Sequence, residues 1–227
     1  MNVSRHFVAA FFSLLGCLLP LAAQTYTEVY PGKKILIGYE KFDVSTIRNR
    51  YNGKILNYTY TKSDGTNVRI ASYEKGANIE VFESAPAPYI HTLYKEFYPD
   101  GRLKQKGIHM PLQVRVGKWI ECDRQGRITE VDYEQGRKAF GYNDILKYLE
   151  QQGYYNSAQS QSIQWVYRFW YSPESGQWGV RLAKGDVHHK RFVFNGTTGY
   201  LEREEDLYSN TTPPTVYDPL FDSKQKE

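Results

Sequence analysis

The sequence predicts an α+β protein that is mostly β, built from antiparallel meanders and hairpins with one helix. Of its 227 residues, 20 are Tyr, 11 are Phe and 4 are Trp, and aromatic residues favour strands. Short β-rich segments alternate with Gly-bearing turns, as in hairpins. Only residues 142–153 show the spacing of an amphipathic helix. Hydrophobic residues make up 41% and charged residues 24%, so the chain can bury a core.

Residues 1–23 have the order of a secretory signal peptide. Arg5 opens a short polar start, residues 7–19 are almost wholly apolar, and the small pair Ala22-Ala23 follows. We therefore expect a secreted or periplasmic protein with no membrane span after signal removal. Cys17 also resembles the cysteine of a bacterial lipoprotein box. This alternative is less favoured because the apolar run continues past the cysteine.

Charge and cysteine content exclude several classes of function. The formal net charge is +4, and removal of residues 1–23, which contain Arg5, leaves 28 − 25 = +3. This excess is too small to indicate nucleic-acid binding. Only Cys122 remains in the exported chain, so no intramolecular disulfide forms, and we expect this thiol to be buried in a strand. No cofactor is expected.

The first predicted unit, residues 24–90, is an N-terminal β-meander. Turn signals separate its strand-like segments, which are residues 34–39, 54–60, 67–73 and 78–82. The segment Ser-Ala-Pro-Ala-Pro at 84–88 cannot continue a strand. It therefore predicts a boundary or a crossover.

The second predicted unit, residues 91–138, contains a repeated turn. The pattern from Tyr98 to Leu103 recurs 25 residues later between Cys122 and Ile128, with an offset of one residue in the turn. Each copy places a Gly before a basic and an aliphatic residue that enter a strand. Gly101 and Gly126 are therefore expected at positive φ in stacked hairpins.

These hairpins resemble the MORN-variant repeats of bacterial secreted proteins and of some antitoxin components. The matching positions are Tyr98, Gly101, Leu103, Gly107, Gly117, Trp119, Gly126, Ile128, Tyr133 and Gly136. The chain departs from the pattern at Cys122 and at Met110-Pro111, which we interpret as an irregular insertion. The resemblance implies a hairpin fold and is nearly silent on function.

The third predicted unit, residues 139–205, is a helix followed by a small β-meander. Asn143 is expected to cap the helix and Gly153 to end it. The order of elements and the turn Thr198-Gly199-Tyr200 resemble a small PepSY-type domain of envelope proteins. The acidic and Pro-containing segment 206–227 is interpreted as a disordered tail.

The binding candidates of the sequence are Arg168 and Trp170. Strand alternation places Trp165, Tyr167, Phe169 and Tyr171 on one face, which we assign to the core. Arg168 and Trp170 then share the other face. A cation beside an aromatic ring suits a glycan or a protein partner if the helix does not cover that face. The sequence leaves open which face the helix covers.

Catalytic and metal patterns are weak. His188 and His189 are adjacent on a predicted strand, so their side chains point to opposite faces and do not readily share a metal. No Gly-x-Ser-x-Gly motif occurs, and the acidic run 202–206 is expected to be solvated. We therefore expect a non-enzymatic binding or scaffold protein of the bacterial envelope, with protein or envelope glycan as its partner. The alternatives are a secreted hydrolase using His and carboxylates, or a toxin-neutralising partner protein.

Overall fold

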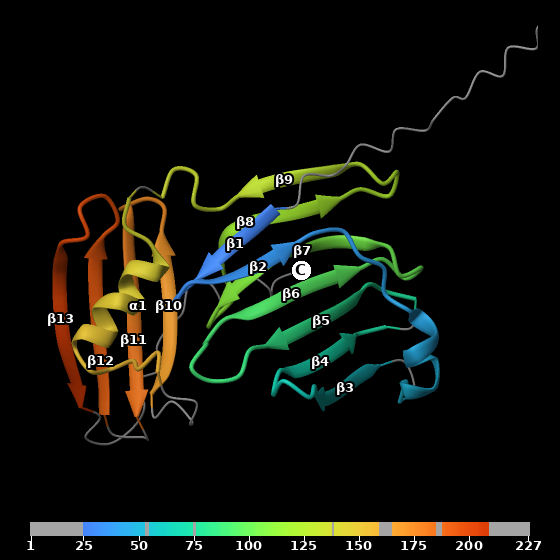
Figure 1. Ribbon diagram of the computed structural model, residues 1–227, viewed down its shortest axis with the longest axis horizontal. Helices are drawn as coiled ribbons and strands as arrows, with labels where there is room; N and C mark the ends of the chain where they lie inside the picture. The colour runs from blue at the N-terminus through green and yellow to red at the C-terminus, as the bar shows by residue number, and fades with distance from the viewer. Residues whose placement is uncertain are drawn as a thin grey trace, which may run out of the picture.

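The described residues form antiparallel sheets of two, seven and four strands. A computed structural model describes residues 25–52, 55–74, 76–137, 139–158, 165–184 and 188–208. The expected signal peptide, Cys17 and residues 209–227 of the expected tail lie outside these ranges. The two larger sheets lie side by side, and the two-stranded sheet crosses the seven-stranded one (Figure 1). The prediction of a mostly β protein is thus confirmed.

Each strand of the seven-stranded sheet pairs with the next strand in the chain. Its strands are β3 (Leu56–Thr61), β4 (Asn67–Ser72), β5 (Ile79–Ser84), β6 (Thr92–Phe97), β7 (Leu103–Met110), β8 (Val114–Cys122) and β9 (Ile128–Asp132). The Pro-containing segment 84–88 joins the paired strands β5 and β6, and the N–H of Ala85 donates to the carbonyl of His91. The expected boundary at residue 90 therefore falls inside one sheet.

The two-stranded sheet, β1 (Thr25–Val29) and β2 (Lys33–Ile37), covers one face of the seven-stranded sheet. Period-two alternation buries an apolar set on that face, namely Val68, Ile70, Ile79, Val81, Phe97, Ile108, Val116 and Ile120. The sequence did not predict β1, because two of its three buried positions are threonines. One of them, Thr27, is satisfied because its hydroxyl donates to the carbonyl of Lys118.

Two turns of this sheet share one hydrogen-bond pattern. The N–H of Tyr98 donates to the carbonyl of Arg102, and Asp123 and Arg127 make the equivalent bond 25 residues later. Gly101 and Gly126 have φ of 81° and 86°, as predicted. The expected one-residue offset is wrong, because Tyr98 is structurally equivalent to Asp123. The same bond joins Lys62 to Thr66, so this type of turn is used three times among the described hairpins.

The four-stranded sheet carries a helix on one face. Its strands are β10 (Val166–Ser172), β11 (Gln177–Lys184), β12 (His188–Asn195) and β13 (Leu201–Tyr208). The ring of Tyr148 in α1 (Tyr142–Gln151) packs edge-on against Phe192 and Phe194. Phe192 lies on the same face as Phe169, which is 0% exposed. The helix therefore covers the face that the sequence assigned to the core.

Two details of the helical prediction change. Asn143 is not the cap; its side chain accepts from the N–H of Tyr30 at 2.7 Å, and the carboxylate of Asp144 accepts from the N–H of Gly141 at 3.1 Å. Helix α1 ends at Gln151, and Gly153 follows the C-cap Gln152 at φ 76°, so this glycine terminates the helix as predicted. The 3₁₀ helix η1 (Val44–Arg50) was not predicted, because so short an element has no amphipathic period.

Strand β13 continues through Tyr208, three residues into the expected tail. Cross-strand ion pairs explain why an acidic segment forms a strand. The ammonium group of Lys190 lies 2.9 Å from Glu204 and 3.1 Å from Asp206. Met110-Pro111 leads directly into the turn between β7 and β8, where Leu112 and Gln113 both have positive φ.

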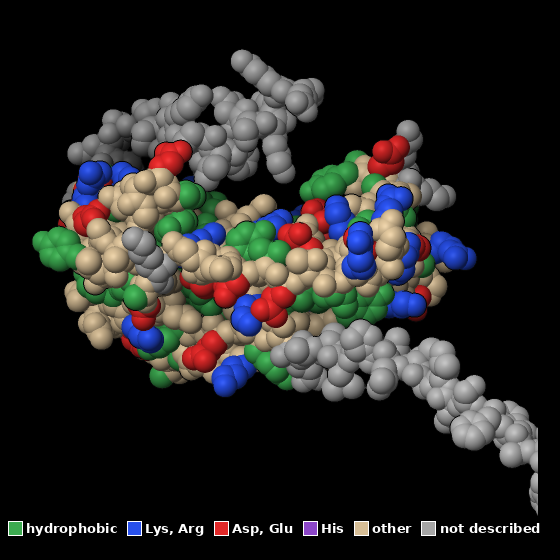
Figure 2. All heavy atoms as spheres, turned by 90° about the horizontal axis from the view of Figure 1, so that it is seen from above, with side chains coloured by type: hydrophobic (Ala, Val, Ile, Leu, Met, Phe, Trp, Pro, Cys, Tyr) green, Lys and Arg blue, Asp and Glu red, His purple; other side chains and the backbone are tan. Residues whose placement is uncertain are grey.

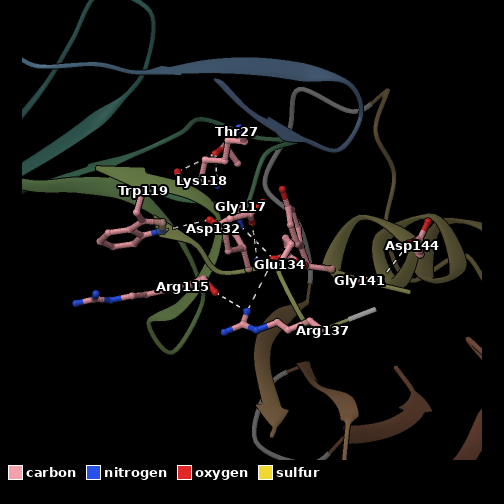
Figure 3. Close-up of polar contacts among 12 residues, drawn as sticks. Thr27, Arg115, Gly117, Lys118, Trp119, Asp132, Glu134, Arg137, Gly141 and Asp144 are labelled. Atoms are coloured by element: carbon pink, nitrogen blue, oxygen red, sulfur yellow. Dashed lines mark hydrogen bonds and ion pairs between the residues drawn. The ribbon is translucent and has the colours of Figure 1, made fainter. Parts of the chain in front are cut away.

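Contacts of Arg137 and Glu134 lie between the seven-stranded and the four-stranded sheet, near the start of α1 (Figure 3). The guanidinium of Arg137 donates to the carbonyl of Arg115 at 2.6 Å and lies 4.8 Å from the ring centroid of Tyr171 in β10. The carboxylate of Glu134 accepts from the N–H of Gly117 at 3.1 Å. Burial raises the pKa of Glu134, although Arg137 opposes this shift. Arg137 therefore contacts both sheets at once.

Candidate functional site

Arg168 and Trp170 lie on the face of the four-stranded sheet that the helix leaves uncovered. Their alternation with Phe169 places them opposite the core, as the sequence predicted. The side chain of Arg168 is exposed and that of Trp170 is half-buried. The open question of which face α1 covers is thus resolved in favour of an accessible pair.

Arg168 belongs to a row of three arginines across neighbouring strands. It pairs in register with Arg181 on β11, which pairs in register with Arg191 on β12. Adjacent strands are about 4.8 Å apart, so the row extends about 10 Å across the sheet. Like charges directly opposite one another on paired strands are destabilising. Repulsion among the three guanidinium groups therefore lowers the stability of the folded protein.

Few carboxylates neutralise this face. Arg191 and Arg203 share Glu205, whose oxygens lie 3.6 Å from each guanidinium. Among the described residues, no carboxylate lies within 4 Å of Arg168 or Arg181. Burial lowers the pKa of Arg181, and the charges of Arg168 and Arg191 lower it further, but an arginine stays protonated.

The remaining contact of Arg181 is with an imidazole. Its guanidinium nitrogen Nη2 lies 3.1 Å from Nδ1 of His189. Because arginine only donates, this contact is a hydrogen bond when Nδ1 carries no proton. Elsewhere the charges are mixed; on the face seen from above, Lys and Arg are interspersed with Asp and Glu (Figure 2). The arginine row is distinct from that pattern.

Trp170 forms a flat apolar surface beside the row. Its in-register partner is Gly179, and a Cβ atom built at Gly179 would lie 1.9 Å from the indole ring. The ring therefore lies across the backbone of β11, which only glycine permits here. The guanidinium carbon of Arg191 is 5.3 Å from the ring centroid. We name Arg168, Arg181, Arg191, Arg203 and Trp170 the cationic face.

Sequence reasoning found two of these five residues. Arg181, Arg191 and Arg203 were missed because each occupies an alternate position on a different strand, and only the strand register brings them together. The alternation within each strand could have shown that these arginines point away from the core. The turn between β10 and β11 could have placed Arg181 opposite Arg168.

Among the described residues, His189 and Glu205 lie on this face, but the buried histidines and the cysteine that a hydrolase could use lie elsewhere. His91 and His109 are buried in the other sheet region, and burial lowers the pKa of each to about 4. Cys122 is buried at the end of β8, as expected, and burial raises its pKa. Within the described ranges, no group of three or more His, Cys, Asp or Glu side chains is arranged to hold a metal ion.

Comparisons with protein-family models, with curated proteins and with solved structures find no match for this chain. In the part of the chain that the structure describes, no helix is long and apolar enough to cross a membrane.

Proposed function

We propose that this chain is an exported, non-enzymatic binding protein of the bacterial envelope whose cationic face holds an acidic glycan. The in-register row of Arg168, Arg181 and Arg191 carries the proposal. Export is supported by the signal-type order of residues 1–23, and the envelope by the MORN-variant and PepSY-type resemblances.

Two features favour an acidic glycan among anionic partners. A guanidinium forms paired, charge-assisted hydrogen bonds with a carboxylate or a phosphate, and a row with regular spacing suits a polymer with regularly repeated charges. The indole of Trp170 supplies an apolar plane beside the row, on which the C–H face of a sugar ring can pack. An acidic protein surface would use the arginines but would not need that plane.

The test is calorimetric titration of the purified protein with polygalacturonate, and with dextran as the neutral comparison. We expect polygalacturonate to bind, dextran not to bind at the cationic face, and the affinity to fall with added salt. Arg168→Gln removes one charge-assisted hydrogen bond, which corresponds to about a tenfold weaker affinity. Trp170→Ala should also weaken binding.

Arg48→Gln is the matched control, because Arg48 is an exposed arginine of η1, remote from the cationic face. It should bind polygalacturonate as the unmodified protein does. If Arg48→Gln and Arg168→Gln lose the same affinity for polygalacturonate, the net charge of the protein explains the binding and the cationic face does not. Binding that survives Arg168→Gln and Trp170→Ala together would contradict the proposal. If an acidic protein binds, and Arg168→Gln weakens that binding while Trp170→Ala does not, the result would favour a protein partner.

A further inference from the structure

The uncovered face of the seven-stranded sheet contains a groove of about 680 Å³. Strands β3 to β7 form its floor, and the turn between β7 and β8 forms one wall. The two-stranded sheet lies on the opposite face, where the apolar core is buried. Ligand pockets of this size hold small molecules or short polymer segments.

One row of the floor consists of hydroxyl, amide and imidazole groups. The register aligns one such residue from each of five consecutive strands, in the order Thr61, Asn67, Ser84, Thr92 and His109. The hydroxyl of Thr61 donates to the side-chain oxygen of Asn67 at 2.8 Å, and the hydroxyl oxygens of Ser84 and Thr92 are 3.2 Å apart. Each hydroxyl has one donor and two acceptor sites, so these contacts leave further hydrogen bonds available.

The neighbouring row is aromatic. Phe82 borders the groove, and its ring centroid lies 5.1 Å from that of Tyr94. The guanidinium of Arg69 lies 4.2 Å from the centroid of Phe82. At one end of the polar row, His109 packs against Tyr94 and Trp119 on the same face of the sheet, with centroid separations of 4.9 and 5.0 Å. This packing fixes the imidazole at the groove floor.

The groove is nearly uncharged. None of its lining residues is an aspartate or a glutamate, and Arg69 is the sole lining cation. Burial lowers the pKa of His109 to about 4, so its imidazole is neutral at pH 7. A polyanion has little to bind here, whereas a neutral ligand rich in hydroxyl groups matches the polar row.

The wall of the groove contains a leucine whose backbone conformation and exposure are both unusual for that residue. Leu112 has φ of 68°, a conformation that a Cβ-bearing residue rarely adopts, and its side chain is 52% exposed. Gln113 follows at φ 63°. Asn-Gly would suit such a turn without strain. Neither conformation nor burial favours a leucine at this position, and strained residues of this kind cluster at ligand-binding sites.

We propose that this groove binds a neutral oligosaccharide that lies across the strands. Its hydroxyl groups would bond to the row from Thr61 to His109, and its C–H surface would pack on Phe82 and against the wall at Leu112. The proposal goes beyond the acidic-glycan site, because it concerns the other sheet and an uncharged ligand.

Calorimetric titration with cellohexaose, chitohexaose and maltohexaose tests it. We expect at least one of the three to bind with a Kd of about 1 mM or tighter. Leu112→Asn is the decisive variant, because asparagine tolerates positive φ and should not lower the unfolding midpoint. The same variant removes the apolar wall, so binding should weaken about fivefold or more.

Thr92→Val removes one hydroxyl of the polar row with little change of shape, and should also weaken binding. Thr129→Val is its control, since Thr129 is an exposed threonine of β9 outside the groove. Arg168→Gln should leave oligosaccharide binding unchanged, which separates this site from the cationic face. The proposal is overturned if none of the three sugars binds, or if Leu112→Asn and Thr92→Val both bind as the unmodified protein does.

Discussion

Gly101 and Gly126 occupy equivalent turns, and the structure distinguishes what each glycine does. Both have positive φ, at 81° and 86°. A Cβ atom at Gly101 would lie 2.2 Å from the carbonyl oxygen of Phe42, which is backbone and cannot rotate away. Around Gly126 nothing lies within 4 Å of such an atom. Substitution by alanine therefore imposes backbone strain at both sites and a steric clash at only one.

The magnitudes follow from these two terms. An alanine at positive φ costs about 1 to 2 kcal/mol relative to glycine. This is the whole effect expected for Gly126→Ala. At Gly101 the clash adds an overpacking cost of about 1 to 3 kcal/mol. It also disturbs the hydrogen bond from the N–H of Phe42 to the carbonyl of Gly101, which is 2.9 Å long. Gly101→Ala should therefore lose about 2 to 5 kcal/mol of unfolding free energy.

Urea unfolding of the two variants measures the difference directly. The midpoint should fall for both and should fall further for Gly101→Ala, while the slope with denaturant stays constant. Gly126→Asn serves as a control, since asparagine tolerates this conformation and should lose less than alanine does. Equal losses at the two glycines would refute the assigned clash, and an unchanged midpoint for Gly126→Ala would refute the assigned strain.

Three further expectations concern the core and the titrating groups. Phe169→Ala should cost about 3 to 5 kcal/mol of unfolding free energy by leaving a cavity, whereas Trp170→Ala should cost clearly less, as denaturant melts can show. Burial raises the folded-state pKa of Glu134, so the charged carboxylate destabilises the fold as the pH rises through that pKa. Glu134→Gln should therefore melt no lower than the unmodified protein at pH 7. A marked fall of the melting temperature would contradict the assignment. Burial lowers the pKa of His91 and of His109 to about 4, so both imidazoles are neutral at pH 7. Their contribution to the unfolding free energy is complete above pH 6.5 and is lost as the pH falls toward 4; at 1.36 kcal/mol per pKa unit each contributes at most about 3 kcal/mol. His109→Gln should therefore make the unfolding free energy less dependent on pH in that interval.

The sequence predicted features that depend on neighbours along the chain. The alternation in β10 assigned Phe169 to the core and Arg168 to the opposite face, because a strand has a strict period of two. The positive φ of Gly101 and Gly126 followed from glycine between strand-like segments. Helix α1 followed from its periodicity, although its cap did not, because Asn143 bonds to Tyr30 from a distant segment.

Features that depend on strand register were not predictable in this way. The cationic face joins arginines of four strands, and the polar row of the groove joins residues from Thr61 to His109. No single window of sequence contains either set. The expected boundary at residue 90 failed for a related reason, since prolines that end one strand also permit the loop that returns the chain to its neighbour.

Both proposed sites depend on the same packing of tryptophan over a strand glycine. A Cβ atom at Gly107 would lie 2.0 Å from the ring of Trp119, as one at Gly179 would lie 1.9 Å from Trp170. A glycine inside a strand weakens it, but at these two positions any Cβ atom would collide with the ring that crosses the strand. Trp119 is fully buried and packs against His109 at the end of the groove, whereas Trp170 stays half-buried beside arginines. The surroundings of each ring therefore determine its role: Trp119 holds a neighbouring residue of the groove in place, whereas Trp170 forms part of the proposed binding surface itself.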